Sequence, residues 1–200
     1  MKLNNYNNLL ELFFDQYEKQ DKNNIFLINL GNPKHKLSWE KTYLLVNHLS
    51  NQISKDIKLG DRCVLISENR PEWMISDLAI MLAGGISVPS YTTYTTKDYE
   101  YIIKDCEPSV LIVSNNTQFN KVKDILDYKK IKKIISFDRL ENLKFQNYLC
   151  IEDIINKKES FENFDSEISL KRSDPACIIY TSGTQGNPKG VILSHGGILS

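Results

Sequence analysis

The sequence contains few of the features that mark a secreted, metal-stabilised or disulfide-bonded protein. Its four cysteines form no CxxC pair, and none lies at ligand spacing from a histidine. This pattern indicates neither a disulfide framework nor a zinc site, and it fits a reducing cytosol. Cys63 and Cys177 lie within apolar, strand-like runs and are expected to be small core residues.

Arginine and net charge are also scarce. Arginine occurs only at positions 62, 70, 139 and 172, and the 25 basic and 25 acidic side chains give a formal net charge of zero. The lysine pairs at 129–130, 132–133 and 157–158 are typical of a solvated surface. Without a dense basic stripe, a nucleic-acid-binding surface is not expected.

No apolar run has the form of an export signal or a membrane span. Lys2 is followed by several asparagines where a signal peptide would have its apolar region. The longest apolar stretch, Trp73 to Tyr91, is interrupted by Asp77 and by a pair of glycines. With 41% hydrophobic and 10% aromatic residues, the chain can build the core of one domain or of part of a larger one.

Apolar runs and turn residues predict alternating strands and helices. The sequence predicts strands over 25–30, 62–67, 86–91, 109–113, 131–137 and 176–180, and helices over about 9–17, 38–53, 71–83, 95–106 and 117–128. Residues 138–174 are weakly patterned, which predicts a loop-rich connection with one short helix near 151–157. The alternation favours an α/β fold with a mostly parallel, doubly wound sheet and flanking helices. Such sheets bind ligands beyond the carboxyl ends of their strands.

The segment that carries chemistry is YTSGTQGNPKGV, residues 180–191, directly after the last predicted strand. Its glycines permit close approach of the backbone, and its hydroxyls and amides can donate hydrogen bonds to phosphate oxygens. Lys189 adds a compact positive charge. The segment therefore predicts a phosphate-binding loop.

Two common nucleotide-binding motifs do not fit this segment. A Walker loop starting at Gly183 requires glycine at 188 and serine or threonine after the lysine, but the chain has Pro188 and Gly190 there. The following residues, Val191 to Leu193, favour a strand where a Walker loop opens a helix. The dinucleotide fingerprint G-x-G-x-x-G does not occur in this segment.

The segment instead resembles the signature of the adenylate-forming superfamily, Y-T-S-G-T-T-G-x-P-K-G-V, with Gln185 as its one departure. This superfamily includes acyl-CoA synthetases, firefly-type luciferases and the adenylation domains of peptide synthetases. Upstream, GDRCV at 60–64, SENRPEW at 67–73 and the run from Gly84 to Thr93 look most like the long-chain fatty acyl-CoA synthetase branch. Within that block, Asn69 is expected to cap a helix, Pro71 to begin it and Trp73 to fill the core.

The resemblance implies an enzyme that joins a carboxylate to ATP, releases pyrophosphate and passes the acyl group to coenzyme A. It implies contacts to ATP phosphates from seven residues: Thr181, Ser182, Gly183, Thr184, Gln185, Gly186 and Lys189. Lys189 is the candidate catalytic residue, because pyrophosphate is a leaving group that needs charge stabilisation. Thr181 is also the candidate ligand of Mg²⁺. An amide at Gln185 can still donate to phosphate, so a rearranged contact is expected there.

The resemblance also implies that residues 1–200 are the N-terminal portion of the AMP-binding large domain. The remainder of that domain and the C-terminal lid would be absent, so this chain alone is not expected to form a thioester. The implied substrates are a fatty acid, ATP and coenzyme A, in the cytoplasm or in peripheral contact with a membrane. Two alternatives stay open: an adenylating enzyme for an amino acid, aryl acid or other carboxylate, and a non-catalytic ATP-binding module. His195, after the loop, is expected to be structural, and the sequence does not indicate an oligomeric state.

Overall fold

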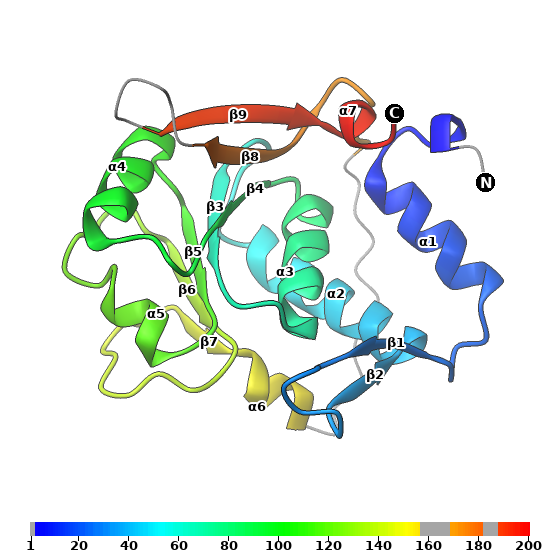
Figure 1. Ribbon diagram of the computed structural model, residues 1–200, viewed down its shortest axis with the longest axis horizontal. Coiled ribbons are helices and arrows are strands. Elements are labelled where there is room, and N and C mark those ends of the chain that lie inside the picture. The colour runs from blue at the N-terminus through cyan, green and yellow to red at the C-terminus, as the bar shows by residue number, and fades with distance from the viewer. Residues whose placement is uncertain (1–2, 157–168, 182–187) are drawn as a thin grey trace.

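A central sheet organises the protein, whose computed structural model describes residues 3–156, 169–181 and 188–200 (Figure 1). Within these residues the sheet has the strand order β7-β6-β5-β3-β4-β8-β9. The strands are β3 (Arg62–Ile66), β4 (Ile86–Ser90), β5 (Val110–Val113), β6 (Lys133–Ser136), β7 (Tyr148–Cys150), β8 (Pro175–Thr181) and β9 (Lys189–Ser194). All neighbours pair in parallel except β8 and β9, which are antiparallel. The predicted mostly parallel sheet is therefore confirmed.

A smaller antiparallel hairpin and eight helices surround the described part of this sheet. The hairpin consists of β1 (Ile25–Ile28) and β2 (Lys36–Ser38). The helices are η1 (Leu3–Asn5), α1 (Leu9–Lys19), α2 (Trp39–Ser54), α3 (Pro71–Leu82), α4 (Thr96–Cys106), α5 (Asn116–Asn120), α6 (Ile151–Asn156) and α7 (His195–Ile198). None of these helices is long and apolar enough to cross a membrane.

The core lies on both faces of the sheet, as a doubly wound fold requires. Along β3, Cys63 and Leu65 pack into one apolar cluster with residues of α2 and α3. Val64 and Ile66 pack into the other, with residues of α4. Because side chains alternate between the faces of a strand, a strand covered by helices on both sides appears as one continuous apolar run. This is why the interior strands were predictable.

Three helices begin with identifiable capping or first-turn residues, of which Pro71 was predicted. The Ser38 hydroxyl accepts from the Lys41 N–H, Pro71 occupies the first turn of α3, and Thr95 with Asp98 forms a capping box. The expected cap at Asn69 is wrong: the N-cap of α3 is Arg70, which makes no side-chain capping bond.

Arg70 instead binds across the sheet end. Its guanidinium donates to both carboxylate oxygens of Asp138, at 2.9 and 2.8 Å, directly after β6. This bidentate ion pair joins the start of α3 to the chain just after β6, which is separated from β3 in the sheet by β5. The helix therefore has its entry fixed by a long-range contact, where a local cap had been predicted.

Three local predictions need correction. The predicted helix over 117–128 ends as α5 at Asn120, and Tyr128 donates its hydroxyl to the Lys123 carbonyl, which a continuous helix would pair with the N–H of Asp127. The sequence pattern did not reveal the three-residue strands β2 and β7. β7 lies within the connection predicted as loop, whereas the short helix predicted there is confirmed as α6.

Candidate functional site

The predicted phosphate-binding segment is framed by an antiparallel strand pair at the edge of the sheet. Thr181 is the last residue of β8 and Lys189 the first of β9, and the two are direct partners in the strand register. Since β8 runs parallel to β4, Thr181 lies at the carboxyl edge of the sheet, where α/β folds bind ligands. In Figure 1 this end of the β8–β9 pair lies next to α4. We call the antiparallel pair of β8 and β9 the phosphate hairpin.

Two of the seven predicted contact residues belong to the described part of the chain. Thr181 and Lys189 are exposed, and neither side chain has a hydrogen-bond or ion-pair partner among the described residues. Ser182, Gly183, Thr184, Gln185 and Gly186 lie outside the described residues. The structure therefore places the two ends of the predicted segment. A hydroxyl and an ammonium group lie on strand residues that face each other.

Gly190 has a packing role that sequence reasoning did not identify. A Cβ at this position would lie 3.0 Å from Ile178 Cγ2 and 3.1 Å from Cζ of Tyr180. Gly190 is also the register partner of Tyr180, so the Tyr180 ring lies across the glycine. A larger residue at this final glycine of the motif would therefore crowd the Tyr180 ring and Ile178 on the neighbouring strand.

A cavity of about 570 Å³ opens beside the phosphate hairpin at the carboxyl ends of β3 and β4. It is lined by Ser67, Glu68, Asn69, Trp73, Pro89, Ser90, Tyr91, Thr92 and Ile179. Trp73, expected to fill the core, packs against it and also forms a wall of this cavity. Apolar walls with a polar rim are typical of small-molecule sites.

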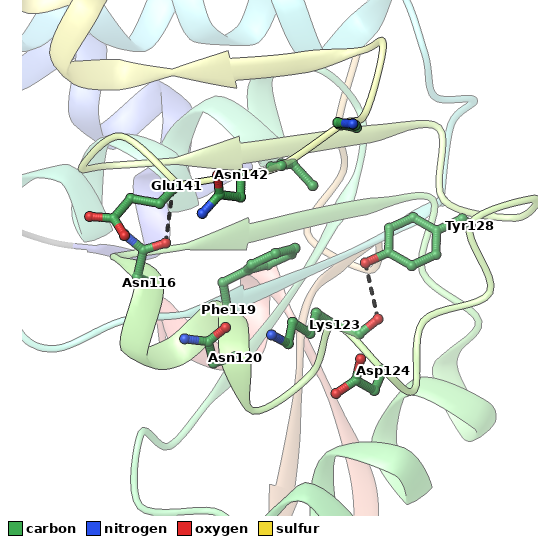
Figure 2. A pocket seen from close by; sticks show the side chains of 10 residues that line it. Asn116, Phe119, Asn120, Lys123, Asp124, Tyr128, Glu141 and Asn142 are labelled. Atoms are coloured by element: carbon green, nitrogen blue, oxygen red, sulfur yellow. Dashed lines mark hydrogen bonds between the residues drawn. The ribbon is translucent and has the colours of Figure 1, made fainter.

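A second cavity, of about 510 Å³, lies between α5 and the loop at 141–144, and Figure 2 shows its lining side chains. Most of them are exposed and polar, and two hydrogen bonds join them: Glu141 N–H to Asn116 and Tyr128 to the Lys123 carbonyl. In the sheet, β5, which leads into α5, is separated from β8 by β3 and β4. This cavity is therefore remote from Thr181 and Lys189.

The structural role expected for His195 is confirmed. Its ring is buried, and Nδ1 accepts a hydrogen bond from the Leu9 N–H at 3.3 Å. Burial lowers the pKa of His195, with a smaller opposing effect from the Asp174 charge. The imidazole therefore links α7 to the first turn of α1 in its neutral form.

Asp77 is a half-buried carboxyl group on α3 that the sequence did not identify as unusual. Burial raises its pKa to about 6. A hydrogen bond with Ser87 of β4 opposes this shift without cancelling it. On β8, the pKa of Cys177 is raised to about 11, first by burial and then by the Asp77 charge. All four cysteines are buried and free, which confirms the core role expected for Cys63 and Cys177.

Comparison with known proteins gives consistent matches over almost the whole chain. The sequence model of the AMP-binding enzyme family matches residues 13–200. The long-chain-fatty-acid–CoA ligase ACSBG1 of Rattus norvegicus is 31% identical over 175 residues, covering 82% of this chain and 24% of that protein. ACSBG2 of Xenopus laevis, a ligase of the same description, is 32% identical and covers 84% of this chain and 23% of that protein. The chain thus spans about a quarter of the length of these curated relatives.

Solved structures agree in fold. The anthranilate CoA ligase AuaEII in complex with anthranoyl-AMP superposes with a TM-score of 0.77 at 23% identity, covering 98% of this chain and 36% of that one. A putative long-chain-fatty-acid CoA ligase from Rhodopseudomonas palustris gives 0.76 at 18% identity, covering 96% and 45%. At these identities the likeness concerns the fold alone.

Proposed function

The chain belongs to the AMP-binding enzyme family, and from this membership we propose that it supplies the phosphate-binding hairpin of an enzyme that activates a carboxylate with ATP. The observation that carries the proposal is the direct pairing of Thr181 with Lys189 at the carboxyl edge of the sheet. The pairing brings a hydroxyl donor and a cation to the two ends of a segment rich in glycine and hydroxyl groups. We propose a long-chain fatty acid as the carboxylate, supported by the names of ACSBG1 and ACSBG2, two relatives above 30% identity.

The proposed chemistry has two balanced steps. A carboxylate oxygen bonds to the α-phosphorus of ATP, the bond from that phosphorus to the bridging oxygen breaks, and pyrophosphate leaves with the electron pair. The thiol sulfur of coenzyme A then bonds to the acyl carbon, the bond to AMP breaks, and the thiol proton is released. Lys189 acts in the first step, because its ammonium group neutralises the charge that develops on pyrophosphate.

The other residues of the predicted phosphate-binding segment are proposed to hold the phosphates in place. The Thr181 hydroxyl donates to a phosphate oxygen, and Ser182, Thr184 and Gln185 are proposed to add side-chain donors. Gly183 and Gly186 are proposed to present backbone N–H groups, since the absence of Cβ permits close approach. Holding the β- and γ-phosphates fixes the α-phosphorus for in-line attack, which lowers the entropic part of the barrier.

Thr181 is also the proposed protein ligand of the Mg²⁺ that accompanies ATP. Its hydroxyl is exposed at the end of β8 and is a hard oxygen donor, which suits this ion. Magnesium, when bound, supplies shielding of the phosphate charge. Thr181 would supply a single ligand to it, in keeping with an ion held mainly by the nucleotide.

We place residues 1–200 in the N-terminal portion of the large domain of such an enzyme. The buried free cysteines suit a reducing compartment, and we propose the cytoplasm. A long-chain substrate would bring the enzyme into peripheral contact with membranes.

Carboxylate-dependent ATP–pyrophosphate exchange in the complete enzyme tests the proposal. Lys189→Ala is expected to lower the exchange rate by at least about a hundredfold, because an electrostatic stabiliser of the leaving group is lost. Lys144→Ala is the matched control: Lys144 is also exposed, but it lines the remote cavity of Figure 2. Equal exchange in the two variants would remove Lys189 from the mechanism.

The carboxylate is identified in the same assay with a panel of substrates. We expect exchange to be fastest with long-chain fatty acids and slow with amino acids and aryl acids. Fast exchange with an aryl or amino acid alone would assign another carboxylate. ATP binding without exchange for any carboxylate would favour a non-catalytic module.

A further inference from the structure

The last peptide of β8 is tied to the rest of the sheet by a side chain. The ladder between β4 and β8 pairs Ser87 with Cys177. Three residues further along β8, the carbonyl of Tyr180 accepts a hydrogen bond of 3.0 Å from the hydroxyl of Tyr94. Tyr94 lies in the connection between β4 and α4. Its hydroxyl therefore extends the link between the two strands to the peptide that joins Tyr180 to Thr181.

Tyr180 makes a second link with its own side chain. Its ring is 3% exposed, and its hydroxyl donates to Asp105 Oδ2 at 2.6 Å, near the end of α4. Burial, and then the hydrogen bond to Asp105, raise the pKa of Tyr180, so the phenol stays protonated as a donor. The same ring lies across Gly190 of β9. One side chain thus joins both strands of the phosphate hairpin to α4.

The direction of the Tyr94 hydroxyl is set by packed rings. Tyr94 makes edge-to-face contacts with Tyr91, at 5.4 Å between centroids, and with Tyr99, at 5.9 Å. Tyr99 is fully buried and donates its hydroxyl to the Tyr91 carbonyl at 2.7 Å. Rings held in this way have few alternative rotamers, so the hydroxyl is a preorganised donor.

We propose that Tyr94 and Asp105 are positioning residues for the phosphate hairpin. The proposal rests on the proposed function, since it concerns the same Lys189 and Thr181. Because these two residues are direct strand partners, fixing the last peptide of β8 also fixes where β9 begins. The ammonium group of Lys189 must meet the leaving pyrophosphate within hydrogen-bond distance, and misplacement by about 1 Å can cost about a hundredfold in rate.

Tyr94→Phe in the complete enzyme tests this role, because it removes one hydroxyl and keeps the ring. The exchange assay should show kcat/KM for ATP lowered about three- to tenfold, the range expected for one hydrogen bond. KM for the carboxylate should not change. Tyr128→Phe is the matched control: Tyr128 also donates to a backbone carbonyl at 3.0 Å, that of Lys123, in the remote cavity (Figure 2). This control should keep the wild-type kcat/KM.

Asp105 gives a second, independent pair of variants. Asp105→Asn keeps an oxygen that can accept from Tyr180 and should retain most of the activity. Asp105→Ala removes the acceptor and should lower kcat/KM for ATP by a factor similar to that of Tyr94→Phe. Equal activity of the alanine variant and the wild type would contradict a positioning role for Asp105.

A double-mutant cycle separates positioning from general stability. If Tyr94 acts in part through Lys189, Tyr94→Phe should cause a smaller fold loss in kcat/KM for ATP once Lys189 is alanine. The same fold loss in both backgrounds, or a loss no larger than that of Tyr128→Phe, would overturn the proposal. Failure of the proposed function is a different result: Lys189→Ala itself would then leave exchange unchanged.

Discussion

Replacing Asp77 with asparagine is expected to stabilise the protein at neutral pH. Burial raises the pKa of this carboxyl from 3.8 to about 6, so the folded state holds its proton more tightly than the unfolded chain does. Below about pH 4, where Asp77 is largely protonated in both states, it has little effect on the unfolding free energy. As pH rises from there through 6, its ionisation lowers the unfolding free energy. One pKa unit corresponds to about 1.4 kcal/mol, so the charged carboxylate costs about 3 kcal/mol at pH 7.5.

Urea unfolding at pH 4, 5, 6 and 7.5 measures this effect. Asparagine has nearly the same shape as a protonated carboxyl group, so the Asp77→Asn chain should match the wild type at pH 4. At pH 7.5 its unfolding free energy should be about 3 kcal/mol higher, with most of the change between pH 4.5 and 6.5. A difference that is constant with pH, or a loss of stability at pH 7.5, would refute the assignment of a buried, destabilising charge.

Asp61→Asn is the control of opposite sign. Burial raises the pKa of Asp61, but hydrogen bonds from the Lys58 N–H, Lys132 and Ser109 outweigh it, and the net pKa is lowered. Its carboxylate therefore stabilises the fold above the unfolded pKa, and this contribution is lost as pH falls. Asp61→Asn should destabilise at pH 7.5 and have a smaller effect at low pH, so the two variants should diverge as pH rises.

Two further substitutions test local packing and capping by urea unfolding. Gly190→Ala should destabilise by about 1–3 kcal/mol through overpacking against Ile178 and the Tyr180 ring, whereas Gly31→Ala, whose nearest neighbour is at ordinary contact distance, should have a much smaller effect. Equal effects would remove the packing role of Gly190. Thr95→Ala removes the capping box of α4 and should lower the unfolding free energy by about 1 kcal/mol, while Thr95→Ser should retain most of it.

The fold was predictable where each residue's pattern is local. Most of β3 and all of β5 are continuous apolar runs, which predict buried strands. Thr95 and Asp98 form a capping box that indicates the start of α4 from four consecutive residues. β7 was not predictable, because Tyr148–Cys150 is a three-residue edge strand inside a polar stretch and depends on pairing with Ile134–Ser136. The predicted length of α5 was wrong for a related reason. Residues 121–128 have helical propensity, but they form turns, and the Tyr128 hydroxyl donates to the Lys123 carbonyl.

The candidate site divides in the same way. The phosphate-binding segment could be predicted from the sequence, because its hydroxyls, glycines and one lysine are the groups that bind phosphate. The residues that hold this segment in place could not be predicted from the sequence. Tyr94 and Tyr180 are 86 positions apart, and neither the ring over Gly190 nor the burial of Asp77 leaves a local pattern.

The antiparallel return of β9 also bears on how much Lys189 must do. In loops that open a helix, the N-terminal dipole adds a partial positive charge at the phosphates. Here Lys189, within the segment, begins a strand, and Lys189 to Ser194 pair back along β8, so these two strands provide no such dipole. Among the described residues of β8 and β9, Lys189 is the one that brings a positive charge to this end of the segment. Its removal is therefore expected to cost far more activity than the loss of the Tyr94 hydroxyl, which only sets where that charge lies.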